Sequence, residues 1–188
     1  MTTLAPTLSV RLFPRTASWL RDAALILAGS WLVAFFAQIE IPMLPVPITG
    51  QTFAVLLIGA LLGSKRGAAA MIAYITQGAL GLPFFAGGAS GLGILTGTTA
   101  GYLLGFVVAA YVIGLLAERG LERSVRTSII PFIVGTVIIY FFGVAWLGIF
   151  MKSFDRVLEF GLLPYLIGDA IKLILASLTL PAAWKFVK

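Results

Sequence analysis

Two residues of opposite charge stand three positions apart in one of the most apolar stretches of the chain. Asp169 and Lys172 lie within YLIGDAIKLILAS, residues 165–177. A spacing of three places both side chains on one face of a helix, where they can pair. Each charge would cost roughly 2.5–3.5 kcal/mol near the middle of a bilayer, so neither is expected to face lipid.

This pair has two readings that the residues alone leave open. Either it joins the last apolar helix to its neighbours, or it lines a partly hydrated cavity. Ion pairs stabilise poorly because desolvation offsets most of their attraction, and we therefore favour the cavity. There the carboxylate would accept hydrogen bonds and the ammonium would donate them, which suits a ligand with adjacent N–H and C=O groups.

The composition is that of a membrane protein. Of the 188 residues, 60% are hydrophobic and 11% charged, and the mean hydropathy is +1.07. A soluble domain of this length could not bury so much apolar surface. Alternating segments of about ten residues, the pattern of membrane barrels, are absent. We predict an all-α membrane protein, a single domain over residues 1–188.

Hydropathy predicts a bundle of six transmembrane helices. They cover residues 22–39, 51–63, 68–80, 95–117, 128–150 and 161–184. The second and third are shorter than the ~20 residues that cross a bilayer. We expect residues 1–21 to form a cytoplasmic or interfacial segment, and we interpret the first apolar run as a retained helix because no small-x-small cleavage pattern follows it.

Basic residues gather in the loops on one side of this predicted bundle. That side holds Arg11, Arg15, Arg21, Lys65, Arg66, Arg119, Arg123, Arg126, Lys185 and Lys188. The opposite side holds only Lys152 and Arg156. The positive-inside rule then places both termini in the cytoplasm, with the proline-rich residues 41–50 and glycine-rich residues 81–93 outside. We expect a multi-pass protein of the bacterial cytoplasmic membrane.

Several kinds of chemistry are excluded by what the sequence lacks. It has no cysteine and no histidine, which excludes disulfides, thiolate nucleophiles and metal sites ligated by histidine. No phosphate-binding loop, H-E-x-x-H or G-x-S-x-G motif occurs. The net charge of +6 belongs to loops facing the cytoplasm rather than to a nucleic-acid surface. We expect neither an enzyme nor a bound cofactor or metal.

Further candidates for a pocket lie near the predicted outer ends of the helices. Thr49 and Gln51 stand where the proline-rich loop meets a helix, and Thr49 suits helix capping as well as ligand contact. Phe84, Phe85 and Tyr102 could form flat apolar walls, although single aromatics more often serve packing.

Small residues at four-residue spacing mark close helix contacts. One stripe comprises Gly97, Gly101, Gly105 and Ala109, and we favour an internal contact for it. A shorter stripe, Ala24 and Ala28, lies on the first predicted helix, where internal and intermolecular contacts are equally open.

Three blocks of sequence together resemble the BioY family. They are PVPITGQTFAVLLIGALLGSKRGAAAMIAY (residues 45–74), GLPFFAGGASGLGILTGTTAGYLLGF (81–106) and GDAIKLILA (168–176). Their order and combination are specific, whereas each block alone is not. The chain departs from the family's L-x-G-P-T-G-G-Y, because Thr98 replaces proline and Ala100 replaces glycine.

The resemblance implies a biotin-specific substrate-capture (S) component of an energy-coupling-factor transporter. Such components are six-helix bundles that bind a vitamin in an outward-facing cavity capped by loops. They generally work with a transmembrane scaffold subunit and two ATPase subunits, so ATP would be used only by the partners. The rivals are an S component for another vitamin and a biotin transporter that works alone.

The resemblance also suggests roles for individual residues. Asp169 would accept the ureido N–H groups of biotin, and Lys172 would donate to the ureido oxygen. The opposite pose, with Lys172 on the carboxylate, stays open. Gly87 and Gly88 would let a loop fold tightly over the ligand. Ala24 and Ala28 resemble the motif by which family members dock on the scaffold subunit.

Overall fold

The computed structural model describes residues 18–185, which form helices and one short hairpin. In chain order the elements are α2 (Ser18–Ala37), β1 (Glu40–Ile41), β2 (Ile48–Thr49), α3 (Gln51–Leu62), α4 (Ser64–Ala79), α5 (Ala100–Ala117), α6 (Val125–Met151), α7 (Phe154–Gly161) and α8 (Leu166–Lys185). Most of the predicted N-terminal segment, with Arg11 and Arg15, lies outside the described residues, as does Lys188.

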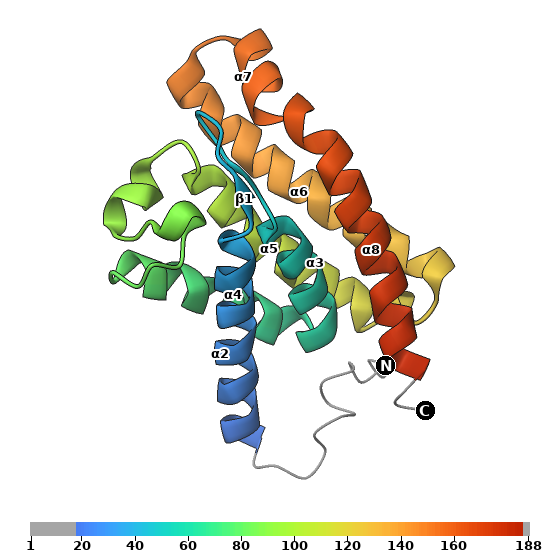
Figure 1. Cartoon of the computed structure of the whole chain (residues 1–188). Helices are drawn as coiled ribbons and strands as arrows, with labels where there is room; N and C mark the ends of the chain where they lie inside the picture. Colours follow the sequence, from blue (N-terminus) through green and yellow to red (C-terminus); the bar gives the residue numbers. More distant parts are fainter. Residues whose placement is uncertain (1–17, 186–188) are drawn as a thin grey trace.

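The long helices run between two ends of the molecule. The start of α2 and the end of α8 lie at one end, and α7 and the tip of the hairpin lie at the other (Figure 1). Four described stretches are long and apolar enough to cross a membrane: residues 19–37, 100–117, 125–151 and 154–183. The prediction of an all-α, six-helix membrane bundle is confirmed, with α2, α3, α4, α5, α6 and α8 as its helices.

Two helices are short, as the sequence predicts. α3 has 12 residues and α4 has 16, which at ~1.5 Å per residue is less than the ~30 Å of a bilayer core. The gap predicted between the helices at 51–63 and 68–80 is too long, because α4 already begins at Ser64. The chain reverses at Gly63 alone, whose φ of 83° is accessible mainly to glycine.

Two other predicted boundaries are also wrong. The helix predicted from residue 95 begins at Ala100, and residues 92–96 form a 3-10 helix instead. The helix predicted from residue 161 begins at Leu166 as α8, and α7 precedes it over residues that were predicted to be a loop. Leu162 is non-helical (φ −131°, ψ −60°), and Pro164 lies near the start of the 3-10 turn 163–165, where its missing N–H leaves no helical hydrogen bond unmade.

The small-residue stripe of α5 is an internal contact, as predicted, except at its first member. A Cβ at Gly101 would lie 2.2 Å from the Cβ of Trp146, and one at Gly105 would lie 3.0 Å from the Cα of Ile139. Ala109 is fully buried. Gly97 precedes α5 and lies outside the stripe. The α5–α6 contact therefore depends on the absence of side chains at two positions.

At the end of the bundle that is predicted to face the cytoplasm, a carboxylate after α5 binds the start of α4; we call this contact the clamp. Glu118, just after α5, accepts hydrogen bonds from the backbone N–H of Ser64 at 2.8 Å and from its hydroxyl at 2.9 Å. A carboxylate at a helix N-terminus satisfies an otherwise unpaired donor and interacts favourably with the helix dipole. The clamp fixes α4 against α5.

Gly101→Ala is expected to destabilise the protein by about 1–3 kcal/mol, because the added methyl group overpacks the α5–α6 contact. Gly148→Ala is the matched control, since a Cβ there meets nothing within 4 Å and alanine favours helix. Thermal unfolding in detergent measures both. Equal melting temperatures for the two variants would contradict the assigned contact.

Candidate functional site

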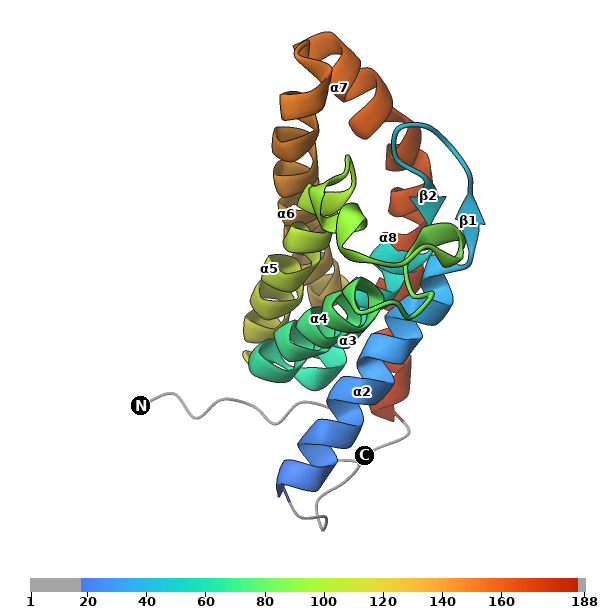
Figure 2. The same cartoon turned by 90° about the vertical axis from the view of Figure 1, so that its left-hand side faces the viewer.

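A cavity lies between the hairpin, α3, α5, α6 and the start of α8. Its lining comprises Val46, Pro47, Thr49, Gln51, Thr52, Phe85, Ala86, Ile94, Thr99, Tyr102, Leu103, Phe106, Ile139, Tyr140, Tyr165, Asp169 and Lys172. Apolar and aromatic residues dominate, and the polar groups collect on α3 and α8. Figure 2 shows the hairpin and α8 side by side at this level.

The break at Leu162 determines where the charged pair lies in its helix. From a helix starting at residue 161, Asp169 would stand ~12 Å along the axis. It instead lies in the first turn of α8, which corrects that expectation. The positive end of the helix dipole favours a carboxylate there. Asp169 is only 6% exposed, so its charge depends on the groups around it.

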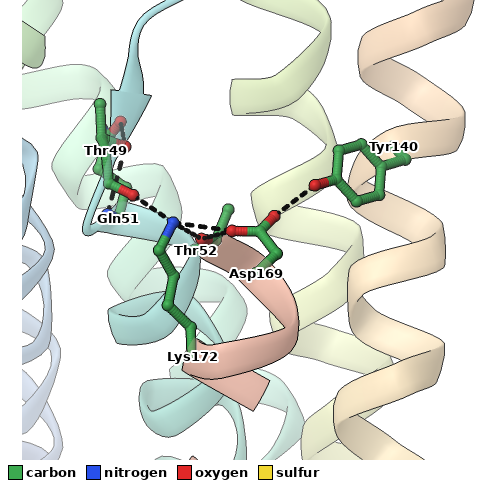
Figure 3. Close-up of polar contacts among 6 residues, drawn as sticks. All are labelled: Thr49, Gln51, Thr52, Tyr140, Asp169 and Lys172. Atoms are coloured by element: carbon green, nitrogen blue, oxygen red, sulfur yellow. Dashed lines mark hydrogen bonds and ion pairs between the residues drawn. The ribbon is translucent and has the colours of Figure 1, made fainter. Parts of the chain in front are cut away.

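Lys172 donates three hydrogen bonds within the protein (Figure 3). Its Nζ lies 2.7 Å from Asp169 Oδ1, 2.6 Å from the carbonyl oxygen of Thr49 and 3.1 Å from Thr52 Oγ1. An ammonium group has three donors and no acceptor. All three are therefore engaged, and a ligand could receive a hydrogen bond from Lys172 only by displacing one of these partners.

Asp169 keeps unused accepting capacity. Its Oδ1 accepts from Lys172 and, at 3.0 Å, from the hydroxyl of Thr52. Its Oδ2 accepts from the hydroxyl of Tyr140 at 2.5 Å. A carboxylate offers about four lone-pair sites, so among the described residues three are occupied and one, on Oδ2, is open. The polar cluster presents an acceptor to the cavity more readily than a donor.

The structure brings six of the nine predicted ligand-binding residues to the cavity: Thr49, Gln51, Phe85, Tyr102, Asp169 and Lys172. Phe84 does not line it. Its ring is buried and stacks on Tyr74, with 6.3 Å between ring centroids. Gly87 and Gly88 are exposed and also lie away from the lining. A Cβ at Gly87 would lie 2.9 Å from Glu40 Oε1. The absence of a side chain at Gly87 therefore lets the Glu40 carboxylate, at the start of β1, lie close to this backbone.

Thr49 and Gln51 support each other at the start of α3. The backbone N–H of Gln51 donates to Thr49 Oγ1 at 3.3 Å, and the Thr49 hydroxyl donates to Gln51 Oε1 at 2.9 Å. Gln51 Nε2 donates to the hydroxyl of Tyr74, which in turn donates to the carbonyl of Phe84 at 3.3 Å. Thr49 thus serves the helix start, and the chain of bonds connects the cavity to the segment carrying Phe84.

Four polar residues of the cavity were missed from the sequence: Thr52, Thr99, Tyr140 and Tyr165. Tyr140 offered a usable signal, because a lone tyrosine inside a long apolar span must direct its hydroxyl to a partner. Thr52 follows Gln51 directly, yet only its contacts with Asp169 and Lys172 distinguish it from an ordinary helix residue. Tyr165 depends on the break before α8, which hydropathy does not detect.

The fold and the cavity define a class of protein, a multi-pass helical membrane protein with a buried ion pair in the lining of an internal cavity. The chain belongs to the BioY family, whose sequence pattern matches residues 6–188. This membership and its apolar helices make it a protein of the bacterial cytoplasmic membrane.

Its relatives carry names that describe transport rather than an enzymatic reaction. The chain is 40% identical over 155 residues to "Biotin transporter BioY" of Thermotoga maritima, covering 82% of this chain and 86% of the relative. It is 35% identical over 168 residues to "Biotin transporter BioY" of Rhizobium etli, with 83% and 85% covered. It is also 33% identical over 163 residues to "Biotin transporter BioY2" of Lactococcus lactis, with 85% and 87% covered.

A solved structure shares the fold. It is described as the S-component for biotin from an ECF-type ABC transporter. It superposes with a TM-score of 0.78 at 24% identity, covering 90% of this chain and 95% of the other. At this identity the likeness concerns the arrangement of the helices.

Lys172→Met is expected to destabilise the ligand-free protein by about 3–5 kcal/mol, because it leaves the buried Asp169 carboxylate without its counter-charge. Asp169→Asn combined with Lys172→Met should recover most of this loss, since no buried charge then remains. Thermal unfolding of the single and double variants measures the coupling. Lys65→Met, at an exposed position, is the control, and an equal loss in that variant would contradict the role given to Lys172.

Proposed function

We propose that the chain binds biotin in this cavity and mediates its uptake as the substrate-capture component of an energy-coupling-factor transporter. The observation that carries the proposal is the buried Asp169 carboxylate, which lines the cavity and keeps one open acceptor site. Membership of a family whose named relatives are biotin transporters supports the choice of ligand.

The open acceptor suggests how biotin would lie. Its flat bicyclic ring carries a ureido group with two N–H donors. One would donate to Asp169 Oδ2, and the other could reach the hydroxyl oxygen of Tyr140, which already donates to the same carboxylate oxygen. Leu103, Phe106 and Ile139 lie in the cavity lining and would contact the apolar part of the ligand. Phe85 and Tyr102 would supply the flat walls.

The ureido oxygen would then need a donor. Lys172 can supply one only by giving up an internal partner, and its bond to the Thr52 hydroxyl, at 3.1 Å, is the longest of the three. Exchanging that bond would keep both the ion pair and the bond to Thr49. The alternative pose, with the biotin carboxylate on Lys172, requires the same exchange and leaves the ureido N–H groups without the Asp169 acceptor.

Asp169→Asn should weaken biotin binding ten-fold or more, because a charge-assisted hydrogen bond contributes about 1.5–3 kcal/mol. Tyr140→Phe should also weaken it, by a smaller factor. Calorimetric titration of the purified protein with biotin measures both. Asp155→Asn, at an exposed position in α7, is the matched control. Wild-type affinity in a folded Asp169→Asn variant would refute the site.

The same titration also tests which ligand binds and in which pose. Biotin lacking the ureido carbonyl should bind much more weakly than biotin, and tight binding of another vitamin in competition would replace biotin as the ligand. We further propose that the chain carries no cofactor or metal and that ATP is consumed only by the partner subunits.

The partner surface that we propose is the exposed face of α2. Ala24 and Ala28 are both exposed. The opposite face packs inward, because a Cβ at Gly29 would lie 3.1 Å from Ala70 Cβ and 3.2 Å from Leu62 Cδ1. Small side chains on an outward face allow another helix to approach closely, as docking on a transmembrane scaffold subunit requires.

Replacing Ala24 and Ala28 together by tryptophan should abolish biotin uptake in cells and leave biotin binding by the purified protein unchanged. The bulky rings would block helix approach without touching the cavity. Ala145→Trp, at an exposed position of α6, controls for the added bulk. Loss of both uptake and binding would indicate a folding role, and uptake in cells without any coupling subunit would favour a solitary transporter.

A further inference from the structure

One wall of the cavity is a segment with little backbone pairing of its own. Residues 45–49, which we call the cover segment, contribute Val46, Pro47 and Thr49 to the lining. The pairing of β1 with β2 stops at Ile41 and Ile48, and Leu44 at the tip is 90% exposed. Side chains from other parts of the chain must therefore hold this segment in place.

Three side chains donate hydrogen bonds to carbonyl oxygens of the cover segment. Thr98 Oγ1 donates to Pro45 at 2.8 Å, Tyr165 Oη to Val46 at 2.5 Å and Lys172 Nζ to Thr49 at 2.6 Å. These donors come from separate places, namely the turn before α5, the 3-10 turn before α8, and α8 itself. The segment is fixed at three points to the helices that surround the cavity.

Thr98 differs from the other two donors because it does not line the cavity. Tyr165 and Lys172 both do, so changing either would alter the ligand site as well. The residue beside Thr98 is anchored to α6, since Trp146 Nε1 donates to the carbonyl of Gly97 at 2.9 Å. Thr98 thus connects a fixed support to the cover segment without facing the ligand.

We propose that Thr98 is a positioning residue that sets how fast a ligand enters and leaves the cavity. The identity of that ligand as biotin rests on the proposed function. Nothing about the Thr98–Pro45 bond requires a ligand, so it would form in both the free and the bound protein and break only when the cover segment moves away. Removing it lowers the barrier to entrance and to exit equally. Both rate constants rise, and their ratio, the affinity, is preserved.

This role also explains the departure of the chain from the motif that it resembles. A proline at position 98 has no hydroxyl and no N–H to donate, so it could not form this bond. Threonine at this position adds a connection between the turn before α5 and the hairpin.

The experiment compares Thr98→Val, which removes the hydroxyl and keeps the shape, with Thr98→Ser, which keeps the hydroxyl. Stopped-flow measurements with biotin should show both rate constants rising about five-fold in Thr98→Val, the equivalent of one hydrogen bond of about 1 kcal/mol. Thr98→Ser should remain within two-fold of wild type, and the equilibrium constant should be unchanged in both. Thr98→Ala replaces the valine variant if the latter does not fold.

A second readout needs no ligand. In the ligand-free Thr98→Val protein, amides within residues 41–50 should exchange hydrogen faster than in wild type, while those of α6 keep their rates. Wild-type exchange and wild-type rates in a folded Thr98→Val variant would overturn the inference, as would a change in affinity alone. If wild-type protein does not bind biotin, the proposed function fails, and the exchange experiment still decides the role of Thr98.

Discussion

The buried ion pair between Asp169 and Lys172 is the constraint on which the rest of the site depends. Two charges in a low-dielectric interior are tolerated only when further hydrogen bonds satisfy them. The chain meets this requirement with groups from α3, α6 and the hairpin, which donate to or accept from the pair. The elements around the cavity are therefore held in register by the need to compensate two charges on α8.

The same compensation makes the site asymmetric. The ammonium of Lys172 is fully engaged within the protein, whereas the carboxylate of Asp169 retains one accepting position. A ligand that mainly donates can bind without disturbing the cluster, and one that needs a donor must exchange with Thr52. Selectivity among ligands would then follow from the cost of that exchange as much as from the shape of the cavity.

The sequence predicts the six helices and the charged pair well, because both are signals carried by single segments. Hydropathy identifies an apolar run, and a charge inside such a run is conspicuous. Contacts between distant segments are harder to predict. Neither the contact of Tyr140 with Asp169 nor that of Thr98 with Pro45 follows from local pattern, and the break at Leu162 changes the position of Asp169 within its helix. Phe84, Gly87 and Gly88 were predicted to contact the ligand because they belong to the glycine-rich loop. Only Phe85 and Ala86 of their immediate neighbours line the cavity.

The single-residue connection at Gly63 gives the cavity a particular mechanical character. A single residue joins α3 to α4, and Ser64 at the start of α4 donates two hydrogen bonds to Glu118. The positions of the two short helices are therefore coupled, and the first turn of α3 carries Gln51 and Thr52. The hairpin above has only a two-residue ladder. The α3 side of the cavity is therefore tied to the rest of the bundle through α4 and Glu118, whereas the hairpin side depends on side-chain hydrogen bonds to three of its carbonyls.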